Sequence, residues 1–394
     1  MLEHVAVKPA HALPLLWRMS RAGWVLPVLF AMAEGFFAEV SAYEKIKLQY
    51  AKRFTVEYRD NLILVAVNEP WRGAREVFKY TFARRGEALP AGVNEKDVIR
   101  TPVRKAVTMS TTTLPMIDLL GKVDVLVGVS EFDFVNTESV RQLIVARKIK
   151  EVGGASNLNI ELLYALDPDI IFTYAYGLAG YDSHPILAAA GIRHVLMACY
   201  MEDTLLGRAE WIKFVAILLG VEEKANREFA IMAAKYEETK AKIGVVQRRP
   251  TVFCNSFYNG VWAMSSGRSM FANAMRDAGG DYLWADSKVS GALDLDFEAV
   301  FNKAAHAEVW LLDKSPIHSL GDLQGQDERY AMFDAFNKGS VFNCNRRLNA
   351  TGGNDFFELG MIKPHLILAD LVKIFHPALM KDYEFCFYKP LGAK

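Results

Sequence analysis

The sequence has few cysteines and lacks the short motifs of the common enzyme classes. Its four cysteines, at positions 199, 254, 344 and 386, form no CxxC pair and no Cys/His cluster of the kind that structural zinc or iron-sulfur sites use. The GxSxG, HExxH, GxxxxGK[ST] and GxGxxG motifs are also absent. We therefore expect a protein that is not an enzyme and has no resident cofactor, with the cysteines packed as small core residues.

The chain also lacks an excess of charge of either sign. Lys and Arg number 46 and Asp and Glu number 46, so no polyelectrolyte attraction draws the protein to nucleic acid or to an anionic membrane. The eight histidines are scattered, and no pair has the spacing of metal ligands. Binding of a bare zinc or manganese ion stays an alternative if distant histidines meet in space, namely His184, His194, His306 and His365.

The first 42 residues differ from the rest of the chain. Arg18 and Arg21 precede an apolar run at 23–30, and small-residue patterns follow at 31–33 and 40–42. This order is typical of a secretory signal with cleavage near residue 33 or 42. Glu34 ends the apolar run well short of the roughly 20 residues that a membrane span requires. Because no cysteine lies near either candidate cleavage site, we expect a free periplasmic protein rather than a lipid-anchored one.

Residues 43–100 have the pattern of a small β extension. The alternating segments 54–58 and 62–67 are joined by Arg59-Asp60-Asn61, which predicts a hairpin, and a third strand is expected near 77–82.

From residue 101 to 203, short apolar runs alternate with helical patterns. Such alternation predicts a mainly parallel sheet covered by helices on both faces. Ligand sites in such sheets lie at the carboxyl ends of the strands. The loops at Ser110, Glu131, Tyr174 and Cys199 are therefore expected to share one rim.

Residues 204–248 carry two helical patterns divided by Gly220, and 249–394 repeat the α/β texture before a final helix at 364–374. In the second helical pattern, Ala225, Phe229, Met232 and Tyr236 form one apolar stripe on a helix of about 24 residues. The sequence thus predicts an α/β protein with two Rossmann-like lobes, mainly parallel sheets and a long bridging helix.

Several segments resemble the periplasmic solute-binding proteins of iron-siderophore, haem and cobalamin ABC importers. Asn159-Ile-Glu-Leu-Leu-Tyr-Ala-Leu-Asp-Pro-Asp-Ile170 is similar to that family's N-x-E-x-[IL]-x-x-L-x-P-D-[LIV] stretch. Asp277-Ala-Gly-Gly280 and Leu295-Asp-Phe-Glu298 resemble segments of the second lobe, and Arg208-Ala-Glu-Trp-Ile-Lys-Phe214 resembles the run into the bridging helix. The β extension departs from the family pattern.

The resemblance implies a monomeric carrier that holds an iron chelate (ferric siderophore or haem) or cobalamin between its lobes and delivers it to a permease dimer. It also implies that Glu161 and Glu298, one on each lobe, dock against permease arginines. Both can also be interpreted as helix first-turn carboxylates that the helix dipole favours, and the two interpretations do not exclude each other.

Candidate ligand-binding residues are aromatic, hydroxyl-bearing or cationic residues near expected strand ends. Rings with polar tips suit a large chelated ligand, and a guanidinium offers a bidentate fork to carboxylate or catecholate oxygens, which favours an iron chelate. The alternatives for these groups are core packing, helix capping and a solvated loop. The candidates are Ser110, Thr111, Tyr174, Tyr176, Tyr200, Phe257, Tyr258, Trp262, Arg346 and Arg347.

The main alternative from another class is an intracellular enzyme on a related double α/β scaffold. A metal chelatase would need a base and converging metal ligands, and a nitrogenase-like reductase would need cluster cysteines. The preference for an iron chelate depends on Arg346 and Arg347 alone; the residue types do not otherwise rank siderophore, haem and cobalamin against one another.

Overall fold

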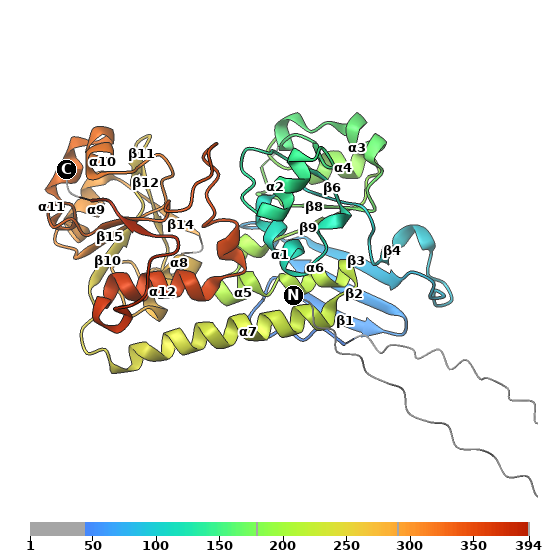
Figure 1. The fold of residues 1–394 in the computed structure, drawn as a ribbon, viewed down its shortest axis with the longest axis horizontal. Helices are drawn as coiled ribbons and strands as arrows, with labels where there is room; N and C mark the ends of the chain where they lie inside the picture. The colour runs from blue at the N-terminus through green and yellow to red at the C-terminus, as the bar shows by residue number, and fades with distance from the viewer. Residues whose placement is uncertain (1–43, 179, 290, 393–394) are drawn as a thin grey trace, which may run out of the picture. The chain divides into compact units, whose positions relative to one another are not determined.

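The structure, a computed structural model, describes residues 44–178, 180–289 and 291–392. The expected secretory signal at 1–42 lies outside these residues. Within them, two α/β lobes are joined by helix α7 (Glu222–Ala241), as expected (Figure 1). No helix in this part of the chain combines the length and apolarity needed to cross a membrane.

The β extension is a four-stranded sheet in the order β1-β2-β3-β4. Its hairpin and third strand coincide with the expected segments, and a short parallel strand, β4, completes it. One face of the sheet packs on helix α6 (Ile212–Leu219), where the Phe54 ring lies tilted with its centroid 5.6 Å from that of Phe214. The buried Arg84 of β3 pairs with the buried Glu222 of α7, which ties the extension to the bridging helix. The strands are β1 (Phe54–Arg59), β2 (Leu62–Asn68), β3 (Val77–Arg84) and β4 (Ile99–Thr101).

The N-terminal lobe is built on a five-stranded, fully parallel sheet in the order β7-β6-β5-β8-β9. The connection after β5 leads to β6 and the connection after β8 leads to β9, on opposite sides of the β5–β8 pair, so these two loops diverge and leave a crevice. Its elements are β5 (Ala106–Thr108), α1 (Leu114–Leu119), β6 (Leu126–Val129), α2 (Glu138–Val145), β7 (Lys150–Glu151), α3 (Ile160–Leu166), β8 (Ile170–Thr173), α4 (His184–Ala189) and β9 (His194–Leu196).

Three helices connect the lobes: α5 (Leu205–Ala209), α6 (Ile212–Leu219) and α7 (Glu222–Ala241). Gly220 ends α6 in the left-handed conformation, φ 67°, which glycine adopts without steric cost. Helix α7 has 20 residues, and its expected apolar stripe is buried. Its length is therefore about 30 Å, at about 1.5 Å per residue.

The C-terminal lobe has a second five-stranded sheet, β13-β10-β15-β16-β17, and a separate antiparallel sheet, β11-β12-β14. The expected final helix forms as α12, but the chain does not end there: it returns as β17, antiparallel to β16. The buried Asp370 of α12 directs this return by accepting hydrogen bonds from the N–H groups of Cys386, Phe387 and Tyr388.

The elements of this lobe are β10 (Thr251–Cys254), β11 (Phe257–Tyr258), β12 (Val261–Ser265), α8 (Met270–Asp277), β13 (Asp281–Tyr282), β14 (Ala292–Leu295), α9 (Phe297–Ala304), β15 (Val309–Leu312), α10 (Leu320–Gln326), α11 (Asp334–Asn337), β16 (Val341–Asn343), α12 (Pro364–Phe375) and β17 (Lys389–Pro390).

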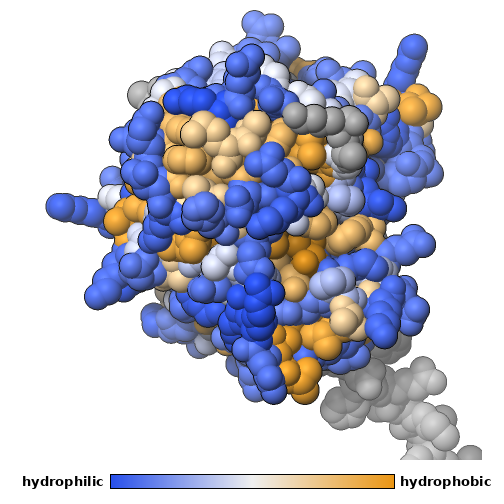
Figure 2. All heavy atoms as spheres, turned by 90° about the vertical axis from the view of Figure 1, so that its left-hand side faces the viewer, coloured by the Kyte–Doolittle hydropathy of each residue, from blue (hydrophilic) through white to orange (hydrophobic). Residues whose placement is uncertain are grey.

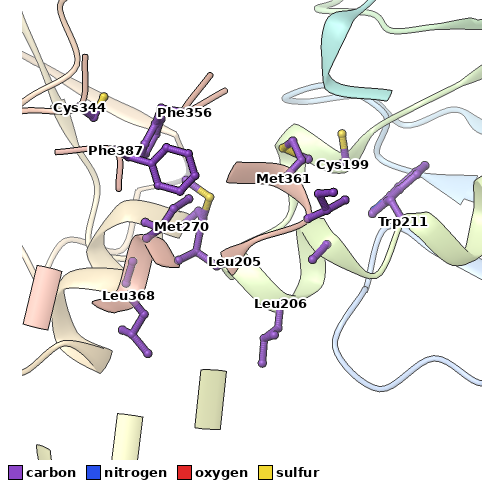
Figure 3. Close-up of a cluster of buried hydrophobic side chains, with 14 of the residues drawn as sticks. Cys199, Leu205, Leu206, Trp211, Met270, Cys344, Phe356, Met361, Leu368 and Phe387 are labelled. Carbon is purple, nitrogen blue, oxygen red and sulfur yellow. The ribbon is translucent and has the colours of Figure 1, made fainter. Parts of the chain in front are cut away.

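One continuous apolar core runs from the β extension through both lobes. Figure 3 shows where it crosses from lobe to lobe: Leu205 of α5 lies beside Met270 of α8, with Met361 and Phe356 nearby. At the face of the C-terminal lobe that Figure 2 presents, hydrophilic residues dominate and apolar ones appear in separate patches. The connection between lobes is thus packed protein and not a bare hinge.

A histidine at the contact between α7 and α12 should make stability depend on pH. Burial and the nearby Lys235 and Lys363 lower the pKa of His365 to about 4. Histidine in the unfolded chain binds a proton near pH 6.5, so above that pH the neutral His365 does not lower the stability of the folded protein. As the pH falls from 6.5 toward 4, protonation favours the unfolded chain and the folded protein loses stability. As the pH falls from 7.5 to 4.5, the unfolding free energy of His365→Gln should rise relative to that of the wild type by on the order of 2 kcal/mol, measured by urea unfolding.

The exposed His306 supplies the control, since its side chain is 91% exposed. His306→Gln removes a histidine outside the contact between α7 and α12 and should not reproduce the gain of His365→Gln at low pH. A His365→Gln variant with the same offset from wild type at both pH values would contradict the assignment.

Candidate functional site

A hollow of about 330 Å³ lies at the carboxyl edge of the N-terminal sheet. Its lining includes residues that follow four of the parallel strands: Ser110 after β5, Glu131 after β6, Tyr174 after β8 and Cys199 after β9. The expected rim is therefore confirmed. Phe357 of the C-terminal lobe completes the wall, so the hollow faces the space between the lobes.

The loop after β8 is held in shape by a buried carboxylate. Asp182, 7% exposed, accepts hydrogen bonds from the N–H groups of Tyr176 (2.7 Å), Gly177 (2.9 Å) and Leu178 (3.1 Å). Three consecutive amides converging on one carboxylate fix the loop without neighbouring secondary structure. The loop thereby presents Tyr174 and Tyr176 to the hollow.

Three of the expected aromatic residues form a continuous row along the hollow. The ring centroids of Tyr174 and Tyr176 are 5.3 Å apart, and those of Tyr176 and Tyr200 are 5.4 Å apart, both edge to face. The Tyr200 hydroxyl donates to the carbonyl oxygen of Ala175 (2.5 Å), and burial raises the pKa of this phenol. Tyr174 and Tyr176 present amphipathic rings on a fixed backbone, an arrangement that suits a bulky ligand.

The hydroxyl-bearing candidates after β5 cap the turn that follows the strand and also line the hollow. Ser110 Oγ accepts a hydrogen bond from the N–H of Thr112 (3.3 Å) and lies 2.8 Å from Thr112 Oγ1. Ser110 and Thr111 line the same hollow as the tyrosines. Capping and a contact with ligand are thus compatible at this turn.

Arg208 of α5 is the most informative residue of the site. Its Nε is buried without a hydrogen-bond partner, and its Nη1 meets only the thioether sulfur of Met270, at 3.0 Å. No carboxylate of the described residues lies within 4.0 Å of its guanidinium. Burial lowers the pKa of Arg208 from its usual value. An uncompensated guanidinium in a cleft is costly unless an anionic ligand completes it.

A second and larger hollow, about 520 Å³, adjoins the first and shares Tyr200 and Arg208 with it. Asn255, directly after β10, lines it from the C-terminal lobe, and Arg53 and Arg72 line it from the β extension. The extension therefore contributes to the cleft.

On one side the cleft is closed by hydrogen bonds between loops of the two lobes. Glu358, 1% exposed, accepts from the N–H groups of Asn136 (2.9 Å) and Thr137 (2.5 Å). Asn349 donates its side-chain amide to the carbonyl oxygen of Asp133 at 2.8 Å. These contacts set the separation of the lobes at this end.

The structure places three expected cleft residues of the C-terminal lobe outside both hollows. Trp262 is fully buried, and its indole N–H donates to the carbonyl oxygen of Cys254 within an aromatic core. Phe257 packs at 6.1 Å against Phe297, and Tyr258 is 69% exposed on the β11–β12 hairpin. Strand β10 ends at Cys254, so the residues beyond Asn255 enter a separate sheet and leave the strand-end position that the expectation assumed.

The expected cationic pair is also placed elsewhere. Arg346 and Arg347 are exposed after β16 and line neither hollow. Arg347 Nε donates to Asp355 Oδ2 at 2.6 Å, so its charge is compensated within its own loop. The guanidinium that lines both hollows is that of Arg208.

Glu161 and Glu298 occupy equivalent positions in the two lobes. Each is the second residue of its helix, α3 or α9, and each helix is capped by a side chain two residues earlier, Asn159 or Asp296. Both glutamates are exposed, and Glu298 lies 3.7 Å from Arg329. Their geometry is that of first-turn carboxylates on opposite lobes.

The four histidines of the metal-ion alternative do not gather at one place, although His184 and His194 are close enough to interact electrostatically. His184 packs against Trp71, His194 lies on β9, and His306 lies 3.6 Å from Asp334. In the described residues, no group of three His, Cys, Asp or Glu side chains could hold a metal ion. The four cysteines are unpaired; Cys199, Cys254 and Cys344 are buried, and Cys386 is partly exposed.

Sequence reasoning missed Arg208 as a ligand-binding candidate, although a signal was present. Between Leu205 and Leu219 the chain is apolar except for Arg208, Glu210 and Lys213. A charged residue in such a run is expected to be buried and therefore to need a partner. Glu210 and Lys213 pair with each other at 2.7 Å, which leaves Arg208 as the unmatched charge.

Comparison with known proteins extends this picture. Residues 107–347 match the model of the periplasmic binding protein family. An uncharacterized lipoprotein of Methanocaldococcus jannaschii is 26% identical over 369 residues, covering 86% of this chain and 84% of the relative.

Solved structures show the same fold. A periplasmic haem-binding protein of Pseudomonas aeruginosa superposes with a TM-score of 0.56 at 17% identity, covering 74% of this chain and 99% of that one. An ABC transporter substrate-binding protein of Listeria monocytogenes EGD-e gives a TM-score of 0.53 at 15% identity, covering 70% of this chain and 99% of that one. These folds are two-lobed, with α/β lobes and largely parallel sheets. The matched segment covers more than half of the sequence, and the chain therefore belongs to the periplasmic binding protein family.

Proposed function

We propose that this protein is the substrate-binding component of an ABC importer that captures an anionic metal chelate between its lobes. The observation that carries the proposal is Arg208, an unmatched guanidinium shared by two adjoining hollows. A ferric siderophore or haem presents catecholate or carboxylate oxygens that a guanidinium binds in bidentate fashion. The preference for an iron chelate over cobalamin depends on Arg208, because Arg346 and Arg347 lie outside both hollows.

The row of tyrosines supports the same ligand class. Tyr174, Tyr176 and Tyr200 supply broad apolar surface with polar edges beside the charge. Large chelates bury such surfaces and are oriented by few polar contacts. A structural relative described as a haem-binding protein agrees with this chemistry.

We further propose that the protein works outside the cytoplasm, after export through the segment at 1–42. The order of basic, apolar and small residues in that segment supports export. A relative described as a lipoprotein is consistent with this location.

The ligand can be identified directly. The protein, purified as expressed, would be examined by absorption spectroscopy and mass spectrometry for bound material, and then titrated with haemin, a ferric catecholate siderophore and cyanocobalamin. Tryptophan fluorescence would report binding. We expect at least one of the two iron chelates to bind at micromolar concentration or tighter. Failure of all three to bind would overturn the ligand class.

Docking to the permease is expected to depend on Glu161 and Glu298. Charges at the rim of an interface mainly affect the association rate and orientation. The double variant Glu161→Ala/Glu298→Ala should therefore lower ligand-dependent ATPase stimulation of the cognate importer in proteoliposomes by roughly tenfold or more, with unchanged ligand affinity.

Two other first-turn glutamates serve as matched controls. Glu138 begins α2, and Glu223 is the second residue of α7 with a 77% exposed side chain. Glu138→Ala/Glu223→Ala removes the same charge and the same dipole interaction. Equal loss of stimulation in both double variants would show that net charge, and not docking, is responsible.

A further inference from the structure

The loop between β2 and β3 of the extension is fastened to the N-terminal lobe. The Tyr200 hydroxyl, which donates to the carbonyl oxygen of Ala175, also lies 3.2 Å from the carbonyl oxygen of Pro70, and the Trp71 ring lies 5.5 Å from the His184 ring. A Cβ at Gly177 would lie 2.4 Å from Trp71 Cδ1, so only glycine allows this approach. The position of the next residue, Arg72, is thereby fixed.

Arg72 lies against the C-terminal lobe at a second glycine. Gly291 has φ 87°, and a Cβ there would lie 2.8 Å from Arg72 Nη1. Glycine thus leaves room for the guanidinium beside the strand β14. Arg268, exposed in the loop before α8, lines the same hollow from this lobe. Three parts of the chain therefore contribute a guanidinium to the larger hollow: the extension, α5 and the C-terminal lobe.

The acidic residues of this hollow do not neutralise these three arginines. Glu202 accepts hydrogen bonds from the N–H groups of Lys52 and Arg53 and from the Trp211 indole. Asp203 lies 3.9 Å from Arg53, which also pairs with Glu69.

Arg72, Arg208 and Arg268 have no carboxylate within 4.0 Å among the described residues. A concave surface with three unmatched guanidinium groups attracts a multiply charged anion.

We infer that Arg72, Arg268 and Arg208 form an anion subsite, contributed partly by the β extension, that binds a polyanionic arm of the ligand bearing carboxylate or phosphate groups. The inference rests on the proposed function, because the subsite adjoins the hollow lined by the tyrosines. It assigns the extension a role in substrate specificity.

Calorimetric titration with citrate and with inorganic pyrophosphate, at matched ionic strength, tests the subsite. We expect one of the two to bind, citrate if the arm is a carboxylate and pyrophosphate if it is a phosphate. Arg72→Gln and Arg268→Gln should each weaken that binding roughly tenfold, because each loses a charge-assisted hydrogen bond. Arg75→Gln, in the same loop but outside the hollow, is the matched control and should bind as wild type.

The results separate this inference from the proposed function. Binding of citrate or pyrophosphate that requires Arg72 and Arg268 supports the subsite even if haemin, the ferric siderophore and cyanocobalamin all fail to bind. Absence of binding by both anions overturns the subsite, whatever the chelates do. Equal weakening by Arg72→Gln and Arg75→Gln also overturns it, because it would indicate a general charge effect.

Discussion

Replacing Arg208 by methionine should weaken chelate binding about 100-fold or more while making the ligand-free protein more stable. Hydrogen bonds to a charged group contribute about 1.5–3 kcal/mol each, and a guanidinium fork makes two of them to an oxyanion. Without ligand, the Nε of Arg208 is buried without a partner. Methionine fills a similar volume beside Met270 without a charge, so the unfolding free energy should rise by about 1–2 kcal/mol.

These opposite signs make the Arg208 experiment decisive. Fluorescence titration with the identified chelate and thermal unfolding without it would be measured on Arg208→Met and Arg208→Lys. Lysine keeps the charge but loses the planar fork, so binding should fall to an intermediate level. Loss of binding together with loss of stability would assign Arg208 a structural role. Unchanged affinity in Arg208→Met would remove the residue from the site.

Glu210→Ala should lower the unfolding free energy by about 3–5 kcal/mol, the range observed when one partner of a buried ion pair is removed. Glu210 is fully buried and accepts hydrogen bonds from the N–H groups of Gln49 (3.0 Å), Tyr50 (2.7 Å) and Ala51 (2.8 Å). It also pairs with the buried Lys213. Its removal leaves three amides without their acceptor and leaves the Lys213 ammonium group, which still donates to the carbonyl oxygen of Lys47, without its counter-ion.

Chemical denaturation and hydrogen exchange would test this prediction. The amides of residues 49–51 should lose protection first, because they depend on Glu210 directly. The double variant Glu210→Ala/Lys213→Met should recover part of the loss, since it also removes the unpaired ammonium. Glu223→Ala, at an exposed site, should change stability by less than about 0.5 kcal/mol. A Glu210→Ala variant as stable as this control would show that the segment is anchored elsewhere.

Short-range patterns in the sequence were sufficient to predict most secondary elements. The hairpin of the extension, the stripe of α7 and the stop at Gly220 all depend on spacing and on backbone preference, which a few neighbouring residues set. The rim of the N-terminal sheet was predictable because parallel strands place their carboxyl ends at one edge. Ser110 and Tyr174 meet there for that reason.

The ligand-binding candidates were predicted less well, because composition does not reveal which way a strand end turns. Trp262 and Tyr174 are both aromatic and both near strands, yet one lies in the core and the other in the cleft. Strand β10 ends at Cys254, before the aromatic segment, and the aromatic residues belong to a second sheet.

The sequence by itself thus determined the family, the two α/β lobes and the bridging helix, since these depend on local periodicity and matched motifs. Only the tertiary structure decided which charges are matched. Arg208 and Arg347 are the same residue type, and what distinguishes them is that Asp355 lies 2.6 Å from Arg347 while no described carboxylate reaches Arg208. That difference arises from contacts between distant segments, because the energy of a buried charge is set by the groups that surround it in space.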